Sequence, residues 1–228
     1  MDKNSYIVVS YRPWHKELFY KKIVKLTGRW HLISDKKNLT FERIKKINPE
    51  FVFFLHWSWL VPEEIINNFN CVCFHETDLP YGRGGSPLQN LIIRGHKKTK
   101  ISAIKMLKGL DDGPIYLKRN LLLGGRAEDI FKRSSLVALD MIREIVAKNI
   151  TPKPQKGEIV VFKRRKPEES EISEFNNLVH LYDFIRMLDA PGYPKAFLKY
   201  KNFIVEFSYP EFKRSKIICK VEIKKYEQ

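Results

Sequence analysis

Short apolar runs bounded by polar or turn residues constrain the fold of this chain most. Three of them cover Tyr6 to Ser10, Phe51 to His56 and Cys71 to Phe74, and each is apolar at nearly every position. Such runs are typical of strands buried on both faces of a parallel sheet. Segments with helical spacing lie between them, at Trp14 to Thr27 and Phe41 to Ile47, which predicts right-handed crossover units. We therefore expect an α/β protein with a Rossmann-like core and a mainly parallel twisted sheet.

The rest of the chain predicts an appendage to this core. With 228 residues, 43% of them hydrophobic, the chain can form one sizeable domain with a small addition. We expect the core to span residues 1–151 and to end after an amphipathic helix at Glu128 to Lys148. A Pro-, Lys- and Arg-rich stretch then opens a smaller, β-rich segment at residues 152–228. In it we expect a helix at Asn176 to Asp189 and a β-hairpin of Lys199 to Ser208 with Ser215 to Lys224.

Charge and cysteine content narrow the class of protein. The net charge of +16 would attract polyanions such as nucleic acid, nucleotide sugars or polyglutamylated folates, but the basic residues are scattered and do not choose among them. No run approaches the roughly 20 apolar residues of a membrane helix, and the N-terminus lacks a signal-peptide layout. Cys71, Cys73 and Cys219 are best explained as buried thiols. We expect a cytoplasmic protein without a membrane or metal site.

Two motifs follow predicted strands. The sequence HETDLPYGRGGSPLQ, from His75 to Gln89, joins an ionisable group, a turn and a glycine-rich loop. The sequence GLDDGPI, from Gly109 to Ile115, places Asp111 on a tight turn. Alone, such residues are more often a strand-end histidine and a turn-forming aspartate. Ligands of open α/β sheets bind beyond the carboxyl ends of the strands, so we expect His75 and Asp111 to meet there.

Together, the two motifs resemble the signature of the formyltransferases that use 10-formyltetrahydrofolate. The matching positions are His75, Leu79, Pro80, Arg83, Gly84, Pro87 and Gly109 to Ile115. The resemblance covers about residues 45 to 150 well and extends more weakly to about residue 210. It implies formyl transfer from 10-formyltetrahydrofolate to a primary amine, with His75 as general base or proton relay and as oxyanion donor. Asp111 would hold His75 or a water in place and stabilise the cation that forms. The resemblance places the folate at Trp57, Ser58, Trp59, Leu60, Leu107 and Gly109.

A second group of residues is expected to bind the amine substrate: Tyr11, Arg12, Trp14, Arg83, Gly84, Gly85 and Gln89. Arg12 and Trp14 have the chemistry to hold a diphosphate and stack a base, although Trp14 could equally cap the first helix. The glycines would bring backbone N–H groups to an anion, or else only form a turn.

One position departs from the family pattern. The family asparagine two residues before the histidine is Cys73 here, and a thiol is a poor hydrogen-bond donor. Loss of one oxyanion donor typically costs on the order of 10²–10³ in rate. Gln89, Asn90 or His56 could supply another donor; otherwise His75 acts alone, or the chain is a slow or inactive relative. We retain Cys73 among the catalytic positions.

The most specific prediction concerns which amine accepts the formyl group. In the family, methionyl-tRNA formylation goes with a longer chain and a full C-terminal barrel, for which residues 152–228 leave little room. We therefore expect a nucleotide-linked amino sugar, such as a UDP-linked 4-amino-4,6-dideoxy sugar on the way to pseudaminic acid, in surface polysaccharide biosynthesis. Nucleic acid is not expected as a partner, and a homodimer is compatible with the sequence. The alternatives are a methionyl-tRNA formyltransferase-like enzyme and a catalytically degenerate folate- or RNA-binding relative.

Overall fold

The computed structural model describes residues 4–175 and 177–226, which form two compact units. The first unit holds the described residues of Met1–Arg83, Lys100–Leu121 and Lys132–Val161. The second holds those of Gly84–Thr99, Leu122–Phe131 and Phe162–Gln228. The predicted division after residue 151 stays a prediction.

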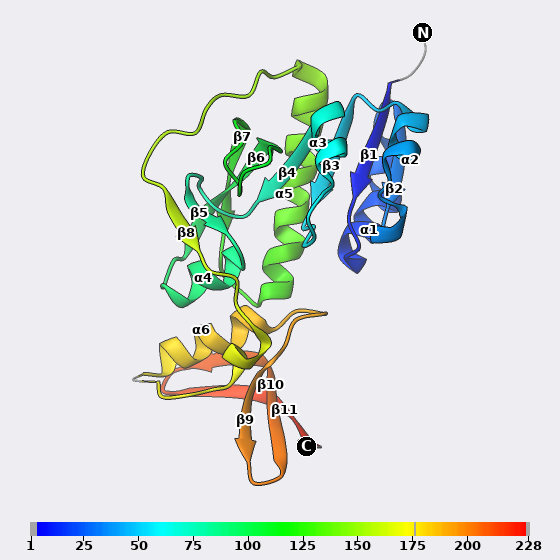
Figure 1. Ribbon diagram of the computed structural model, residues 1–228. Helices are drawn as coiled ribbons and strands as arrows, with labels where there is room; N and C mark the ends of the chain where they lie inside the picture. The colour runs from blue at the N-terminus through cyan, green and yellow to red at the C-terminus, as the bar shows by residue number, and fades with distance from the viewer. Residues whose placement is uncertain (1–3, 176, 227–228) are drawn as a thin grey trace. The chain divides into compact units, whose positions relative to one another are not determined.

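A six-stranded sheet with the order β2-β1-β3-β4-β6-β7 forms the centre of the first unit (Figure 1). Its strands are β1 (Ser5–Val9), β2 (Arg29–Ile33), β3 (Phe51–Leu55), β4 (Cys71–His75), β6 (Lys98–Lys105) and β7 (Ile115–Leu122). Parallel pairing joins β1 to β2, β1 to β3 and β3 to β4, whereas β6 runs antiparallel to β4. The predicted α/β class with a mainly parallel sheet is confirmed. The antiparallel direction of β6 was not predicted.

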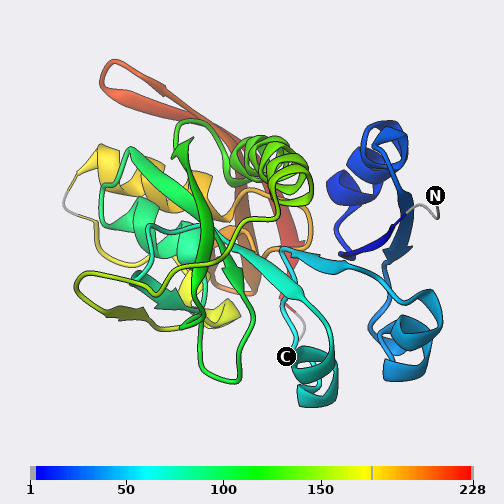
Figure 2. The same cartoon turned by 90° about the horizontal axis from the view of Figure 1, so that it is seen from above.

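Helices cover both faces of this sheet (Figure 2). On one face, α2 (Phe41–Ile47) and α3 (Glu63–Asn68) pack on a core of strand side chains that includes Ile7, Val52 and Phe54. On the other face lie α1 (Pro13–Lys21) and the part of α5 (Ala127–Lys148) that belongs to this unit. The apolar runs of β1 and β3 are buried at every position, because both faces of the sheet are covered.

The first helix is shorter than predicted. α1 ends at Lys21, before the predicted end at Thr27, and a 3-10 turn, η1 (Ile23–Lys25), follows. Lys22 already leaves helical geometry at φ −129°, and the β-branched pair of Ile23 and Val24 disfavours a helix. By contrast, α2 matches its predicted range, because the Thr40 side chain accepts from the Arg43 N–H at its start.

The second unit contains an antiparallel three-stranded sheet in the order β11-β10-β9. Its strands are β9 (Ala196–Tyr200), β10 (Phe203–Lys213) and β11 (Lys216–Lys225). The prediction of a two-stranded hairpin is therefore incomplete, because the sheet has a third strand. Lys201 adopts a left-handed conformation at φ 52°, so the predicted strand Lys199 to Ser208 contains a turn.

Two helices accompany this sheet, α4 (Pro87–Ile93) and α6 (Leu178–Leu188). Asn177 caps α6 by accepting from the His180 N–H, and Asn176 of the predicted helix lies outside the described residues. The remaining elements are η2 (Lys36–Asn38), η3 (Pro167–Ser170) and the two-stranded sheet of β5 (Tyr81–Gly84) with β8 (Val160–Phe162). Within the described ranges, no helix is long and apolar enough to cross a membrane.

Candidate active site

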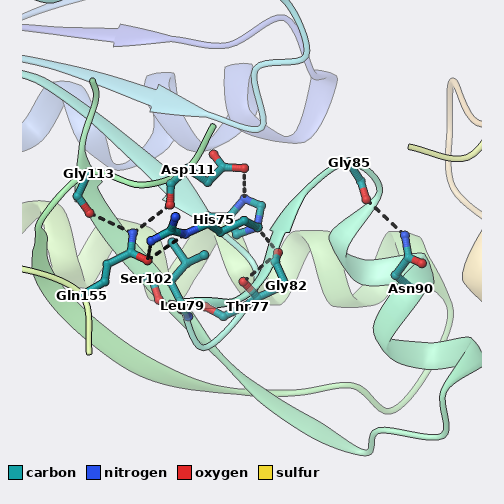
Figure 3. A network of polar contacts seen from close by, with 11 residues as sticks. His75, Thr77, Leu79, Gly82, Gly85, Asn90, Ser102, Asp111, Gly113 and Gln155 are labelled. Atoms are coloured by element: carbon teal, nitrogen blue, oxygen red, sulfur yellow. Dashed lines mark hydrogen bonds and ion pairs between the residues drawn. The ribbon is translucent and has the colours of Figure 1, made fainter. Parts of the chain in front are cut away.

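His75 and Asp111 lie together at the end of β4 (Figure 3). The Nε2 atom of His75 donates to the carbonyl oxygen of Gly82 over 2.7 Å, and Nδ1 lies 3.7 Å from Oδ2 of Asp111. A carbonyl oxygen can only accept a hydrogen bond, so Nε2 carries a proton. The nitrogen left to exchange a proton with a substrate is therefore Nδ1, which faces the carboxylate.

The loop between β6 and β7 holds Asp111 in a left-handed conformation at φ 48°, which a short polar side chain tolerates. Of the two glycines in the motif around it, Gly113 is needed for a close approach of backbone, whereas Gly109 faces only the side chain of Asp112. A Cβ atom on Gly113 would lie 1.7 Å from the backbone oxygen of Lys105, and one on Gly109 would lie 1.9 Å from Oδ2 of Asp112. The GLDDGPI spacing thus follows from the tightness of this loop.

Ser102 fixes the loop that follows His75, and it was not predicted as a site residue. It pairs with His75 in the β4–β6 register. Its hydroxyl donates to the carbonyl of Thr77 over 2.8 Å and accepts from the N–H of Leu79 at 3.3 Å. One buried hydroxyl therefore satisfies two backbone groups of a loop that must turn sharply. The only sequence signal is a serine inside an otherwise apolar segment.

A buried polar cluster lies next to this pair, on the face of the sheet covered by α1 and α5. The guanidinium Nη2 of Arg12 lies 3.4 Å from Nε2 of His56, and because guanidinium only donates, Nε2 must accept. The other ring nitrogen, Nδ1, lies 3.6 Å from Oε1 of Glu76. Burial raises the pKa of Glu76, but the neighbouring imidazoles of His56 and His75 outweigh it, so the pKa is lowered.

The same cluster includes His15, which hydrogen-bonds to Ser10 through Nδ1 and Oγ at 2.7 Å. Burial, and then the nearby His56 and Arg12, hold its pKa well below the ordinary value of 6.5. His15, His56 and Glu76 line a small cavity, so this is an interior network. Arg12 and Trp14, predicted to bind the amine substrate, are only 7% and 6% exposed and belong to the interior of this unit.

Trp57 and Trp59, predicted to bind folate, lie together with Tyr11, which was predicted to bind the amine substrate. Tyr11 packs against Trp59 with ring centroids 4.4 Å apart, and Trp57 meets Trp59 edge to face at 4.7 Å. The Tyr11 hydroxyl and Ser58 Oγ are hydrogen-bonded at 3.1 Å. Leu60 is 96% exposed. The cluster therefore presents ring faces and an apolar side chain at the surface of the first unit.

Arg83 is engaged within the protein. Its Nε and Nη2 atoms donate to Oε1 of Gln155 over 3.1 and 2.8 Å. The Nε2 atom of Gln155 in turn donates to the carbonyl oxygens of Asp111 and Gly113. Gln155 lies in the stretch that was predicted only as a domain boundary, and no local sequence signal indicates its contact with the Asp111 loop.

Two glycines of the first motif belong to the second unit. Gly84 adopts φ 99°, where glycine is favoured. The N–H of Gly85 donates to the carbonyl of Phe162 over 3.0 Å, and a Cβ atom there would lie 2.5 Å from the Cα of Arg164. Gly85 is thus required by the approach of another segment of backbone, and its N–H group is already paired.

The candidates for replacing the family asparagine have other partners. The Gln89 amide donates to the carbonyl of Met187, and the Asn90 amide donates to the carbonyls of Gly85, Ser86 and Lys163. Cys73 is held protonated, because burial, reinforced by the charges of Asp111 and Glu76, raises the pKa of its thiol.

Other features of the first unit bear on the predicted chemistry. Leu107, predicted to contact folate, is half-exposed in the loop that carries Asp111.

Burial raises the pKa of Cys71 to about 12. Within the described part of the chain, no group of three or more His, Cys, Asp or Glu side chains is arranged to hold a metal ion.

Comparison with known proteins gives the class. Residues 167–224, which contain α6 and all but the last residue of the three-stranded sheet, match a family model described as the methionyl-tRNA formyltransferase, C-terminal domain. A 4-N formyltransferase from Francisella tularensis superposes with a TM-score of 0.68 at 15% identity, covering 99% of this chain and 98% of that one. This likeness shows the fold alone. The fold is that of a formyltransferase.

Two relatives are more informative. Methionyl-tRNA formyltransferase from Clostridium thermocellum is 50% identical, with a TM-score of 0.92, over 97% of this chain and 99% of that one. Methionyl-tRNA formyltransferase from Thermodesulfovibrio yellowstonii is 31% identical over 153 residues, which cover 64% of this chain and 50% of the relative. The chain belongs to the methionyl-tRNA formyltransferase family. It spans about half to two thirds of the length of the first curated relatives it matches.

These findings correct two predictions. The expected nucleotide-linked amino sugar, and with it a role in surface polysaccharide biosynthesis, is wrong, because the relatives above are named for methionyl-tRNA. The expectation that nucleic acid is not a partner is wrong for the same reason. The sequence argument failed at the C-terminal segment, which was judged too short, although residues 167–224 match the C-terminal domain model.

Proposed function

We propose that this protein transfers the formyl group of 10-formyltetrahydrofolate to the amino group of methionyl-tRNA. The observation that carries the proposal is the pairing of His75 Nδ1 with Asp111 at 3.7 Å, in a chain half identical to a methionyl-tRNA formyltransferase over nearly its whole length. A histidine with one nitrogen fixed and the other beside a carboxylate has the groups needed for proton transfer from an amine.

The aromatic cluster fits the ring of the formyl donor. The Nε1 atom of Trp57 is buried, and in the described part of the chain it has no hydrogen-bond partner. Such a donor, next to the ring faces of Tyr11 and Trp59, suits a flat heterocycle with polar edges. Leu60, with Leu107 and Gly109 from the loop that carries Asp111, would complete an apolar rim. When bound, 10-formyltetrahydrofolate supplies the formyl group.

His75 would take up the proton released by the amine at Nδ1, because Nε2 is already committed to Gly82. The resulting imidazolium would have an acceptor on each side, the Gly82 carbonyl and the Asp111 carboxylate. Asp111 thus stabilises the charged form of His75 and orients its ring. The base chemistry therefore depends on one nitrogen atom.

The protonated Nδ1 would then donate toward the formyl oxygen, and His75 would pass the proton to the folate nitrogen when the bond between that nitrogen and the formyl carbon breaks. The other candidates for a donor to the formyl oxygen are engaged, since Gln89 and Asn90 donate to backbone carbonyls and His56 lies between Arg12 and Glu76. The thiol of Cys73 remains protonated and is a weak donor. We propose that His75 is the only donor to the oxyanion. This predicts that turnover is slower than in family members that have the asparagine.

The acceptor can be tested with initial rates of formylation of methionyl-tRNA, using 10-formyltetrahydrofolate as donor. We expect formylmethionyl-tRNA to form, and deacylated tRNA to inhibit as a competitor. The net charge of +16 predicts that binding weakens steeply with salt, because each phosphate contact releases counterions. The matched control is His75→Ala, which should bind tRNA with the same salt dependence but not turn over. Salt-dependent tRNA binding without turnover by the unmodified protein would instead indicate a degenerate relative.

A further inference from the structure

The side chain of Gln155 is fixed on the Asp111 loop. Two residues before it, Lys153 exchanges two backbone hydrogen bonds with Ile115, at 2.7 and 2.9 Å. From this anchored segment the Nε2 atom of Gln155 donates to the carbonyl oxygens of Asp111 over 2.7 Å and Gly113 over 2.9 Å (Figure 3). Both of its N–H groups are therefore used on the loop that carries the Asp111 carboxylate.

The other end of the same amide reaches the opposite side of His75. Oε1 of Gln155 accepts from Arg83 Nε and Nη2 over 3.1 and 2.8 Å. Arg83 follows Gly82 directly, and the carbonyl of Gly82 accepts from Nε2 of His75. One amide thus connects the segment that faces Nδ1 of His75 with the segment that fixes Nε2.

The Asp111 loop needs such a contact. Asp111 is a non-glycine residue in a left-handed conformation, and its neighbours Gly109 and Leu110 are exposed. A catalytic carboxylate must be held closely, because a displacement of about 1 Å in an active site can cost on the order of a hundredfold in rate. The hydrogen bonds from Gln155 act on the backbone of Asp111 itself.

We propose that Gln155 is a positioning residue for the Asp111 carboxylate, and that Arg83 acts through Gln155 rather than on a substrate. This inference rests on the proposed formyl transfer. An amide is required, because the position needs two donors toward carbonyl oxygens and an acceptor toward a guanidinium. A glutamate of the same shape would keep the Arg83 contact but set its second oxygen against two carbonyls.

A double-mutant cycle tests the inference, with Gln155→Ala, Asp111→Asn and the combination. Gln155→Ala should lower kcat about tenfold to a hundredfold, with KM for methionyl-tRNA changed by less than about twofold. In the Asp111→Asn background, the same substitution should have almost no further effect, because there is no carboxylate left to position. Equal losses in the two backgrounds would overturn the proposal, since a purely structural role would act in both.

Two further variants test whether the amide donors of Gln155 are required. Gln155→Glu should be at least as slow as Gln155→Ala, whereas Glu158→Gln, at an exposed position on the same segment, should match the unmodified protein. Normal kcat in Gln155→Glu would contradict the need for donors. Thermal unfolding of every variant shows whether a loss of rate comes from a loss of folded protein.

A readout without substrate separates this inference from the proposed function. The ring nitrogen NMR signals of His75 report the contact with Asp111, and they should shift in Gln155→Ala and Asp111→Asn but not in Glu158→Gln. If the unmodified protein does not formylate methionyl-tRNA, the proposed function fails, while this shift still decides the role of Gln155. Unchanged His75 signals in a folded Gln155→Ala variant would overturn the inference.

Discussion

Nδ1 of His75 and Oδ2 of Asp111 lie 3.7 Å apart, too far for a hydrogen bond but within range of an ion pair. On the far side of the ring, Nε2 is bound to Gly82 at 2.7 Å. In the proposed mechanism, this asymmetry confines proton transfer to the nitrogen that faces the carboxylate. The carboxylate would then stabilise the ring after it has taken up the proton of the amine.

Asp111→Asn should lower kcat by at least about a hundredfold, because the amide keeps the shape of the side chain but cannot stabilise the imidazolium. Binding of the folate donor should stay within about twofold, since Asp111 is not expected to contact the pterin ring. Steady-state kinetics with methionyl-tRNA check both values. Asp112→Asn is the control at the adjacent exposed position, and a similar loss there would mean that loop structure, not the carboxylate, is responsible.

Cys73→Ala should keep kcat within about threefold, because a thiol whose pKa is raised by burial stays protonated and donates weakly. Cys73→Asn should raise kcat on the order of tenfold, by adding the carboxamide donor that the family pattern has there. Initial rates for the two variants and the unmodified protein decide this. A hundredfold loss in Cys73→Ala would show that the thiol takes part in the reaction.

Acid should destabilise the protein through His15 at pH values where its carboxylates are still charged. Burial, with His56 and Arg12 nearby, lowers the pKa of His15 well below 6.5. His15 therefore binds a proton in the unfolded chain at pH values where it stays unprotonated in the native state. The free energy of unfolding decreases as the pH falls below about 6.5. The slope is at most about 1.4 kcal/mol for each pH unit.

Urea denaturation of the unmodified protein and of His15→Gln between about pH 7 and pH 5 measures this effect. The variant should show a flatter dependence on pH. Glu76 does not contribute here, because its lowered pKa removes stability only below its ordinary value of 4.5. Parallel curves for the two proteins would rule out His15 as the source.

Gly113→Ala should destabilise the fold and slow turnover together. The new Cβ atom would lie 1.7 Å from the backbone oxygen of Lys105, so the loop two residues from Asp111 must move, at a cost of about 1–3 kcal/mol. Urea midpoints and kcat measure the two effects. Gly124→Ala adds a Cβ atom with nothing within 4 Å and should change neither.

The sequence predicts those parts of the fold where a local pattern has one solution. The runs at β1, β3 and β4 are apolar at nearly every position and are covered on both faces. α2 is capped by Thr40 and ends before the left-handed Asn48. The end of α1 differs from the prediction because the β-branched Ile23 and Val24 disfavour a helix that the spacing of apolar residues would otherwise continue. The direction of β6 could not be predicted, because strand direction depends on pairing with β4 and not on the strand's own sequence.

The site, like the fold, has residues that the sequence could predict and residues that it could not. The proximity of His75 and Asp111 could be predicted because each lies in a motif that follows a strand. Gln155 and Ser102 could not, because each acts through hydrogen bonds to the backbone of segments far away in the sequence, Gln155 to Asp111 and Ser102 to Thr77. Arg12 was expected to hold a diphosphate because a guanidinium suits phosphate, yet here it is buried beside His56. Such contacts exist only in the folded chain.

The most direct test is the release of tetrahydrofolate from 10-formyltetrahydrofolate with methionyl-tRNA as acceptor, measured for the unmodified protein and for His75→Ala. We predict release that depends on methionyl-tRNA and falls by at least about a hundredfold in the variant, with the variant still folded and still binding tRNA. Release at an unchanged rate in His75→Ala would contradict the account, and so would a folded protein that binds methionyl-tRNA and the folate but releases no tetrahydrofolate.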